Sequence, residues 1–540
     1  MACLVGPIVG TRWPAGKRGR SPVFIGGVAG AVFGLYPAAV VASVLGCQVH
    51  GLEGHPVEVQ VDVSAGVPGF FLVGLATGSV REARERVRAA IRNSGLPFPL
   101  RRLTVNLAPA ELRKEGSGLD LAIAVGVSLA ALGRSSPPGT AFLGELALNG
   151  QVRHVDGVLV AARSLARHGV RDLFVAASDA AEAALVERLR VFAAPSLAAV
   201  VAHLGGEAPI PPYAGGPPRV EEGAVEHDLA EVGGQEAARR ALEVAAAGRH
   251  HLLLCGPPGA GKTMLARCLP GLLPPMTLEE ALELAEVRSV LGELPAGRPL
   301  DWTRPFRAPH HSISTAGLVG GGSRLAVPGE VSRATRGVLF LDELAEFQPV
   351  VLQALRQPLE EGRVVITRSG GPVTYPAHFQ LVAATNLCPC GWTGDDRRPC
   401  RCTPGAVQAY QRALSGPITD RIDLQVTVPR TPPEVLGREA SGEPSRTVRA
   451  RVERARRVQL ERQGVLNAGL RAADLRRWAP LRPAARAALE RWAEARGLTG
   501  RGFHRAWRVA RTLADLDGGG PIGEEHVLEA LGYRLLERAA

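Results

Sequence analysis

The segment Gly256-Pro-Pro-Gly-Ala-Gly-Lys-Thr263 fits the pattern G-x-x-x-x-G-K-[ST] at every position. The residues His251–Cys255 before it predict a strand, and Met264–Leu269 after it begin a helix. In such a strand–loop–helix unit the glycines let backbone N–H groups surround phosphate oxygens, and the helix N-terminus adds a favourable dipole. We therefore expect a nucleotide-binding α/β layer around this loop. The residues expected to contact the nucleotide are Gly256, Pro257, Pro258, Gly259, Ala260, Gly261, Lys262 and Thr263.

Two further features supply the polar groups that hydrolysis of ATP requires. Lys262 can reach the terminal phosphates, and the Thr263 hydroxyl is a ligand for Mg²⁺. The apolar run Val338–Leu341 predicts a buried strand, which is followed by Asp342 and Glu343. We expect Asp342 to hold the Mg²⁺ through water, and Glu343 to orient and polarise the attacking water as a general base.

Two later polar residues belong to the same predicted layer. The strand Phe379–Thr385 ends at Asn386, which we expect to sense the terminal phosphate; the alternative is a plain turn at a strand end. Arg421, within Asp420–Asp423, precedes another short strand. It is expected to reach the ATP of a neighbouring subunit and neutralise charge in the transition state, with a surface salt bridge as the alternative.

Four cysteines lie close together in a C-x-C…C-x-C arrangement: Cys388, Cys390, Cys400 and Cys402. Four thiolates in so short a segment can close a tetrahedral zinc site. No histidine lies within the cluster, so a structural zinc is favoured over an open catalytic one, and four unliganded thiols are the alternative. Its place directly after Asn386 predicts a clamp on a loop inserted in the nucleotide-binding core.

The composition bounds the class of protein. A chain of 540 residues is too long for one hydrophobic core, and 46% apolar with 21% charged residues is typical of folded domains. The net charge of +11 suits a polyanionic partner. Only Lys17, Lys114 and Lys262 are lysines, so the charge is mostly arginine, and coding bias is the alternative explanation. Eight cysteines in so long a chain do not make a disulfide scaffold, and the clustered four favour a reducing, cytoplasmic compartment.

An uncharged segment near the N-terminus, Ser21–Val49, imitates a signal sequence or a membrane anchor. Several glycines and Pro37 interrupt it, and a strand pattern begins inside it. We therefore expect no membrane anchor. Residues 1–36 are interpreted as a non-native or disordered extension, with the native start near Pro37–Val41.

Breaks in the pattern divide the rest of the chain into three folded parts. A predicted strand hairpin, Cys47–Val63, begins the first of them. The parts and their linkers are 37–204, a Pro/Gly-rich linker 205–226, a region 227–430 of alternating strands and helices, a linker 431–445, and a helical region 446–540.

These features together resemble the magnesium-chelatase-like AAA+ family, and closely its ComM/YifB branch, from about Val41 to the C-terminus. The resemblance implies an α/β protein with an N-terminal Lon-protease/S5-like α+β domain, a central AAA+ P-loop α/β domain and a C-terminal helical lid domain. The matching strings include Phe306-Arg-Ala-Pro-His-His311, Pro328-Gly-Glu-Val-Ser-Arg333, Asn386-Leu-Cys-Pro-Cys-Gly391 and Leu112-Arg-Lys-Glu-Gly-Ser-Gly118.

The resemblance implies a homo-hexameric ring with ATP between subunits, in which Arg421 is the finger. The lid of such a ring carries a second sensor arginine that contacts the nucleotide. Arg501 is the best match for it, and Arg505 is the fallback.

Two further features of this family face the central pore of related rings. One is an insertion in the second helix, matched around Phe306–Gly322, and the other is a hairpin before the sensor strand, matched at Arg363–Tyr375. This makes Arg368, His310 and His311 candidate DNA contacts.

The N-terminal domain looks like the Lon-protease/ribosomal S5 fold, whose peptidases use a Ser–Lys pair. The serine column falls on Gly118, beside Ser117, and the lysine column falls on Leu159. A serine nucleophile needs a base in reach, and Lys114 lies too close in sequence to replace the missing partner. We expect a binding or ring-forming module without peptidase activity.

For the whole chain the resemblance implies an ATP-driven hexameric DNA helicase or translocase that promotes branch migration in homologous recombination during natural transformation. Branched or single-stranded DNA would be bound without sequence reading, and recombination proteins are further candidate partners. A magnesium-chelatase-type motor subunit is the first alternative. A chaperone-like remodeller of protein complexes is the second.

Overall fold

The computed structural model describes most of the chain after residue 40. The predicted extension, residues 1–36, and much of the two predicted linkers lie outside the described residues. No helix within the described ranges is long and apolar enough to cross a membrane. The described residues are 41–74, 78–215, 226–295, 297–322, 326–368, 371–395, 397–414, 418–432, 434 and 442–534.

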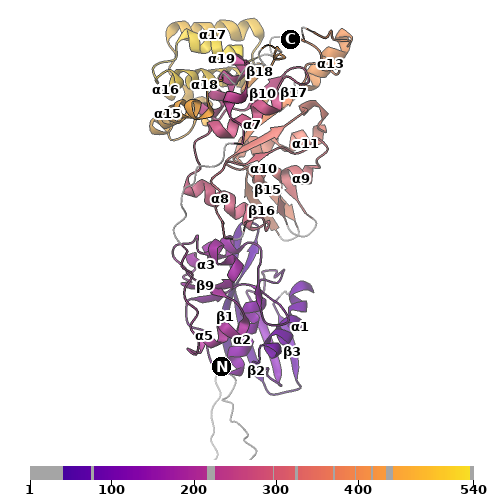
Figure 1. The fold of residues 1–540 in the computed structure, drawn as a ribbon, viewed down its shortest axis with the longest axis vertical. Coiled ribbons are helices and arrows are strands. Elements are labelled where there is room, and N and C mark those ends of the chain that lie inside the picture. Colours follow the sequence, from indigo (N-terminus) through magenta and orange to yellow (C-terminus); the bar gives the residue numbers. More distant parts are fainter. Residues whose placement is uncertain are drawn as a thin grey trace, which may run out of the picture. The chain divides into compact units, whose positions relative to one another are not determined.

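The N-terminal part is built on a seven-stranded mixed sheet with the order β3-β4-β2-β1-β5-β8-β9 (Figure 1). The pairs β1/β2 and β2/β4 are antiparallel, whereas the other neighbours run parallel. A small hairpin, β6/β7, lies beside it. The strands are β1 (Val41–His50), β2 (Glu53–Ser64), β3 (Gly69–Val73), β4 (Arg102–Ala108), β5 (Thr140–Phe142), β6 (Glu145–Leu146), β7 (Val152–Arg153), β8 (Asp172–Ala176) and β9 (Arg190–Ala194).

Alternation of apolar and polar residues explains the first hairpin. Val57, Val59 and Val61 are fully buried, and the residues between them are not. Only Gly51 and Leu52 separate β1 from β2. The sheet packs against α2, which is apolar on every side and therefore buried along its length. The helices of this part are α1 (Gly78–Asn93), α2 (Asp120–Ala131), α3 (Val158–Arg167), α4 (Ala180–Ala183) and α5 (Leu197–Leu204).

The central part contains a parallel five-stranded sheet with the order β11-β14-β17-β10-β18. Its inner strands are continuous apolar runs, as strands covered on both faces require. One expectation is corrected here. Phe306–Arg307 is an edge strand of this sheet, paired with Val338–Leu339, so the insertion begins after it. The strands are β10 (Leu252–Cys255), β11 (Phe306–Arg307), β14 (Val338–Leu341), β17 (Gln380–Thr385) and β18 (Leu424–Thr427).

Helices and two small hairpins surround this sheet. One hairpin, β12 (Gly320–Gly321) with β13 (Val327–Pro328), lies in the insertion, and the other, β15 (Arg363–Arg368) with β16 (Gly371–Pro376), precedes the strand β17. The helices are α6 (Glu236–Gly248), α7 (Lys262–Leu272), α8 (Leu278–Ser289), α9 (Thr315–Val319), α10 (Glu330–Arg333), α11 (Pro349–Ala354), α12 (Arg356–Glu361) and α13 (Pro404–Leu414).

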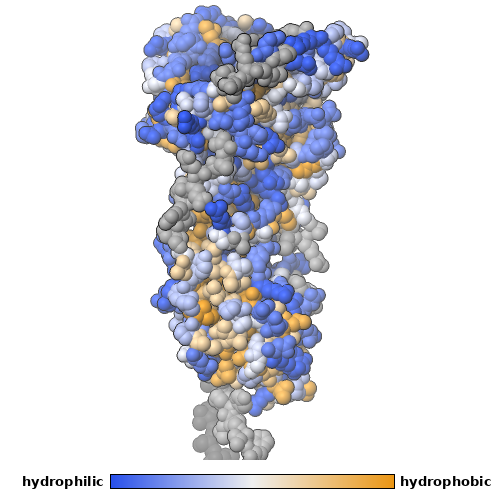
Figure 2. Space-filling view, viewed as in Figure 1, coloured by the Kyte–Doolittle hydropathy of each residue, from blue (hydrophilic) through white to orange (hydrophobic). Residues whose placement is uncertain are grey.

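The C-terminal helices share a core with the nucleotide-binding part. Val448 and Val452 belong to the same buried cluster as Leu242 and Leu265 of the central helices. Their outer face is mostly hydrophilic in Figure 2, as the arginine-rich sequence predicts. The helices are α15 (Ser445–Gln463), α16 (Ala472–Trp478), α17 (Pro483–Arg496), α18 (Gly500–Leu516) and α19 (Glu524–Gly532).

Candidate nucleotide site and cysteine cluster

The phosphate loop links β10 to α7 and depends on two of its glycines. Gly261 directly precedes the helix and has φ of 85°, a conformation that favours glycine. At Gly256, a Cβ atom would lie 2.1 Å from the carbonyl oxygen of Val428, so only glycine permits this approach to the end of β18. The loop therefore lies at the carboxyl edge of the parallel sheet, where such sheets bind their ligands.

The Lys262 ammonium lies within this loop. Its Nζ donates hydrogen bonds to the carbonyl oxygens of Gly256 (2.6 Å) and Pro257 (2.9 Å) and to Oδ1 of Asn386 (3.2 Å). Burial lowers the pKa of Lys262, and the nearby Asp342 charge opposes that shift. The two residues expected at the terminal phosphate therefore meet, because β10 and β17 are adjacent parallel strands.

The expected Mg²⁺ ligands are also in contact. Thr263 donates its hydroxyl to Oδ2 of Asp342 at 2.9 Å, and Oδ1 of Asp342 accepts the backbone N–H of Glu343 at 3.0 Å. Glu343 has φ of 53°, which is unfavourable for a residue other than glycine and is typical of functional sites. Its side chain is 60% exposed. A hydroxyl beside one carboxylate, with a second carboxylate open to solvent, is a donor set suited to Mg²⁺ and an attacking water.

These groups line one cavity of about 690 Å³. Sequence reasoning did not assign five of its lining residues to the nucleotide: His311, Glu346, Thr385, Pro389 and Tyr410. Thr385 ends the strand β17, and three others, His311, Glu346 and Pro389, lie within five positions after a strand of the parallel sheet. A position at or just after the end of a strand is therefore the signal that could have found these four. Tyr410 lies in the helix α13, and this signal does not mark it.

His311, a candidate DNA contact by resemblance, lies beside Glu343 at the nucleotide cavity. Its Nδ1 is 3.4 Å from a carboxylate oxygen of Glu343, and its ring packs edge-on against Phe347. The neighbouring His310 is exposed and contacts Ser312. His311 reaches the nucleotide cavity because β11 runs parallel to β14, so the residues after both strands leave at the same edge.

The three arginines expected at the nucleotide lie outside the cavity of their own chain. Arg421 is 9% exposed and forms an ion pair with Glu360. Arg501 is exposed in the first turn of α18, whereas Arg505 of the same helix lies 3.7 Å from the buried Asp423. Neither Arg421 nor Arg501 is among the residues that line the nucleotide cavity of the same chain.

Arg368 is the last residue of β15 and is exposed. Its guanidinium donates to the carbonyl oxygens of Gly322 (2.8 Å) and Thr367 (2.9 Å). The hairpin is thereby tied to the insertion that contains Gly322. Residues 369 and 370, which join β15 to β16, lie outside the described part of the chain.

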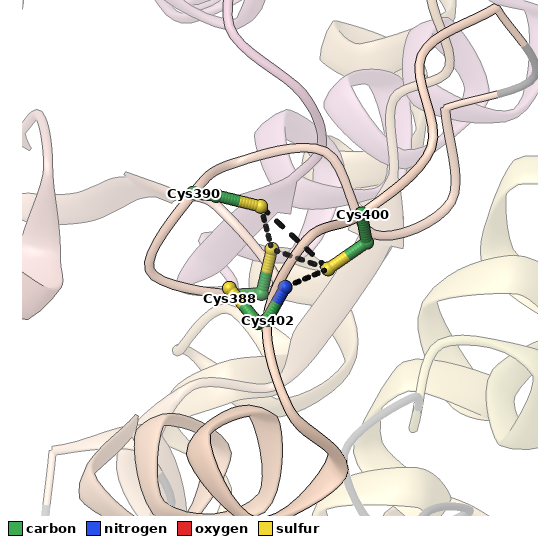
Figure 3. A group of neighbouring side chains, drawn as sticks. All are labelled: Cys388, Cys390, Cys400 and Cys402. Atoms are coloured by element: carbon green, nitrogen blue, oxygen red, sulfur yellow. Dashed lines mark hydrogen bonds between the residues drawn. The ribbon is translucent and has the colours of Figure 1, made fainter.

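The four clustered cysteines converge in the loop between β17 and α13, with their side chains directed toward one another (Figure 3). The Sγ atoms of Cys388, Cys390 and Cys400 lie 3.5 to 3.6 Å apart, and all four sulfurs lie within 4.8 Å of one another. Backbone N–H groups of Arg401 and Trp392 lower the pKa of Cys390 to about 6, which favours its thiolate form.

This arrangement fits zinc. Four sulfurs placed about 2.3 Å from a tetrahedral zinc are about 3.8 Å apart, close to the observed spacing. An S₄ donor set of this geometry suits zinc or an iron–sulfur centre and does not suit Mg²⁺ or Ca²⁺, which take oxygen ligands. The cluster is thus distinct in chemistry from the Thr263–Asp342 pair.

A second cavity, of about 400 Å³, is lined in part by Ser117 and His154 of the N-terminal domain. Ser117 donates its hydroxyl to Glu145. Lys114 is fully buried, its ammonium donates to the carbonyl oxygens of Leu107 and Pro109, and burial lowers its pKa. The lysine is therefore committed to the backbone, as is expected of a residue with a structural role.

A parallel sheet with this strand order defines the class of protein, because it brings a phosphate loop, an Asp–Glu strand end and an adjacent asparagine into one cavity. The class is the P-loop ATPase of the AAA+ type. Three family models match the chain: "Magnesium chelatase, subunit ChlI" over residues 228–436, "Subunit ChlI of Mg-chelatase" over 59–179, and "Magnesium chelatase, subunit ChlI C-terminal" over 442–534.

Relatives extend the match over nearly the whole chain. The competence protein ComM of Haemophilus influenzae is 45% identical over 500 residues, which cover 90% of this chain and 96% of the relative. The uncharacterized protein YifB of Escherichia coli is 43% identical over 497 residues, with 90% and 96% covered. Lon protease 2 of Bacillus subtilis is 30% identical over 184 residues, 29% of this chain and 32% of that protein. The chain belongs to the ComM/YifB family of magnesium-chelatase-like proteins, and membership of this ATPase family implies ATP hydrolysis.

Proposed function

We propose that this protein is an ATP-driven DNA translocase that works as a homo-hexamer and moves branch points during recombination. The observation that carries the ATPase part is the single cavity that holds Lys262, Asp342, Glu343 and Asn386. The DNA part rests on the similarity to a relative named a competence protein, on the net charge of +11, and on the exposed Arg368.

At the nucleotide, each side chain has a role that its position supports. Lys262 neutralises charge on the terminal phosphates, and Asn386, 3.2 Å from it, senses their presence. Thr263 and Asp342 hold the metal side of the site. Mg²⁺ supplies charge neutralisation and orientation of the phosphates when it is bound. Glu343 accepts the proton of the attacking water as general base.

Between subunits, Arg421 completes the site of the next protomer. It lies on the turn before β18 and away from its own cavity, which is the placement that action in a neighbouring subunit needs. Arg501, exposed on the lid, is proposed as the second sensor in the same interface. A ring therefore hydrolyses ATP only when its interfaces are closed.

DNA is proposed to contact the hairpin β15/β16 and the insertion that Arg368 joins to it. Arg368 and the exposed His310 are the candidate contacts, and His311, placed beside Glu343, would act from the nucleotide side. Phosphate contacts carry no sequence information, so binding falls steeply with salt and varies little with sequence.

The cysteine cluster is proposed to hold one structural zinc. The convergence of four sulfurs without a histidine or carboxylate in the described cluster supports a closed site. It leaves no open position for a substrate, so the metal would fix the loop and take no part in chemistry.

Turnover of ATP with and without forked DNA tests the proposal. We expect forked or single-stranded DNA to stimulate the wild type, and the Arg368→Ala protein to keep its basal rate and lose the stimulation. If the wild type binds no DNA even at low salt, the DNA proposal is wrong. Stimulation by a protein partner would then support a remodeller, and stimulation by a porphyrin and chelatase subunits would support a chelatase motor.

A further inference from the structure

The cysteine loop lies against the nucleotide site at two points. It begins directly after Asn386, and Pro389 lines the nucleotide cavity. Gly391 lies against the phosphate loop, because a Cβ atom built there would be 2.9 Å from both Cγ and Cδ of Pro258 and 3.6 Å from Nδ2 of Asn386. The loop thus contacts the phosphate loop and the predicted sensor residue together.

The far side of the loop is held by aromatic and ionic contacts. The Trp392 ring has the guanidinium of Arg398 at 4.3 Å and that of Arg430 at 5.3 Å from its centroid. Arg430 also forms an ion pair with Asp395 at 3.3 Å. Because Arg430 follows β18, the loop connects the ends of the two strands that flank β10.

Besides the cysteines, the near side of the loop is held at its start, where Leu387 packs on the buried core and its carbonyl oxygen accepts a hydrogen bond from Gln411. In the described part of the segment between β17 and α13 the backbone forms no helix or strand, and apart from Cys388 and Gly391 its residues are half-buried or exposed. Such a segment takes many conformations unless a crosslink restrains it. A metal bound by two pairs of cysteines would supply that restraint.

We propose that the metal-bound cysteine loop is the outer wall of the nucleotide site, and that its metal sets the affinity for ATP by holding Gly391 and Pro389 against Pro258 and Asn386. This inference rests on the zinc and ATP sites proposed above. It gives the metal a role in nucleotide binding although no cysteine touches the nucleotide. Loss or oxidation of the four thiols would then weaken ATP binding.

Two glycines of the loop allow this contact to be tested without touching a cysteine. Gly391 and Gly394 have nearly equal φ, 83° and 81°, so alanine at either position introduces the same backbone strain. They differ in surroundings, because a Cβ atom at Gly394 has nothing within 4 Å, whereas at Gly391 it meets Pro258. Gly394→Ala is therefore a matched control for Gly391→Ala.

The experiment measures zinc content, thermal unfolding and the Kd of a fluorescent ATP analogue for the full-length wild type and both variants. We expect all three proteins to hold zinc, Gly394→Ala to bind the nucleotide like the wild type, and Gly391→Ala to bind it about fivefold or more weakly, the usual size of a coupling between adjacent sites. Equal affinities for the two variants would overturn the inference.

A second experiment, in which the metal itself is removed, distinguishes this inference from the zinc proposal. Cys390→Ser should abolish zinc binding and weaken the analogue at least as much as Gly391→Ala does, with the circular-dichroism spectrum of the wild type retained. If the wild-type protein contains no zinc, both the metal proposal and this inference are wrong. A zinc-free Cys390→Ser protein with wild-type nucleotide affinity contradicts only the inference, and leaves zinc with a purely structural role.

Discussion

The nucleotide cavity, of about 690 Å³, and the cavity beside Ser117, of about 400 Å³, both contain polar side chains, but those side chains are used differently. In the first, the Asp342 carboxylate and the Thr263 hydroxyl face each other, and Glu343 is open to solvent. In the second, Ser117 is bound to Glu145. Only polar groups that remain available to a ligand can give a cavity a binding or catalytic role.

His154 lines the second cavity together with Ser117. Its Nδ1 contacts Asp179 at 2.6 Å and its Nε2 contacts Asp156 at 3.2 Å. Although burial acts to lower it, the two carboxylates raise the pKa of His154. Both ring nitrogens thus already contact carboxylates, whereas a serine nucleophile requires a base in contact with its hydroxyl.

The largest expected effect is at Arg421, which we propose completes the nucleotide cavity of the neighbouring subunit. Arg421→Ala should lower ATP turnover on the order of a thousandfold, because a finger that stabilises transition-state charge has an effect of this size. Mixing Arg421→Ala subunits with Glu343→Gln subunits should restore part of the activity, since some interfaces then join an intact Glu343 to an intact Arg421. No recovery in mixed rings would contradict the action of Arg421 in a neighbouring subunit.

Within the cavity, Glu343→Gln should still bind ATP and lower turnover by roughly a hundredfold or more, since the water loses its general base. Lys262→Ala should instead weaken nucleotide binding. Steady-state hydrolysis and analogue binding separate the two outcomes. Near-normal turnover by the Glu343→Gln protein would remove Glu343 from the mechanism.

Removal of the metal should have an effect of intermediate size among these predictions. The effect should be limited to the nucleotide cavity and should not reach the cavity beside Ser117. Protein purified without chelator should contain about one zinc per chain, the stoichiometry of a four-thiolate site. Replacing Cys402 with serine should remove the zinc and lower the unfolding temperature. The affinity for Mg²⁺ should change less than the stability does. A zinc content near zero in the wild type would exclude the site.

The smallest expected effect is at Ser117. Ser117→Ala should leave ATP turnover within about twofold of the wild type, as substitutions away from functional groups do. A peptidase assay of both proteins with a casein-type substrate tests whether the cavity beside Ser117 is catalytic. Peptide cleavage that the substitution abolishes would show that the second cavity is catalytic after all.

Much of the nucleotide site could be predicted because its parts are local in sequence. The apolar runs before Gly256 and Asp342 specify buried parallel strands, and parallel strands bring their ends to one edge. The order of strands then places Asn386 beside Lys262. The four cysteines could be grouped for the same reason, since both pairs lie in one loop.

The parts that escaped prediction depend on long-range pairing. The strand Phe306–Arg307 has two residues and one of them is charged, so no periodicity marks it, and only its pairing with β14 places it in the sheet. Because that strand was missed, His311 was assigned to a pore-facing insertion. The contact of Gly391 with Pro258 likewise joins two loops that no sequence pattern relates.

Branch migration on a synthetic three-strand fork most directly tests the claim that the nucleotide cavity drives movement along DNA. We predict that the wild-type protein displaces the strand with ATP and Mg²⁺ and not with a non-hydrolysable analogue, that it does so on unrelated sequences at similar rates, and that the Glu343→Gln protein binds the same fork without displacing it. Displacement by the Glu343→Gln protein, or none by a wild type that hydrolyses ATP in the presence of the fork, would contradict the claim.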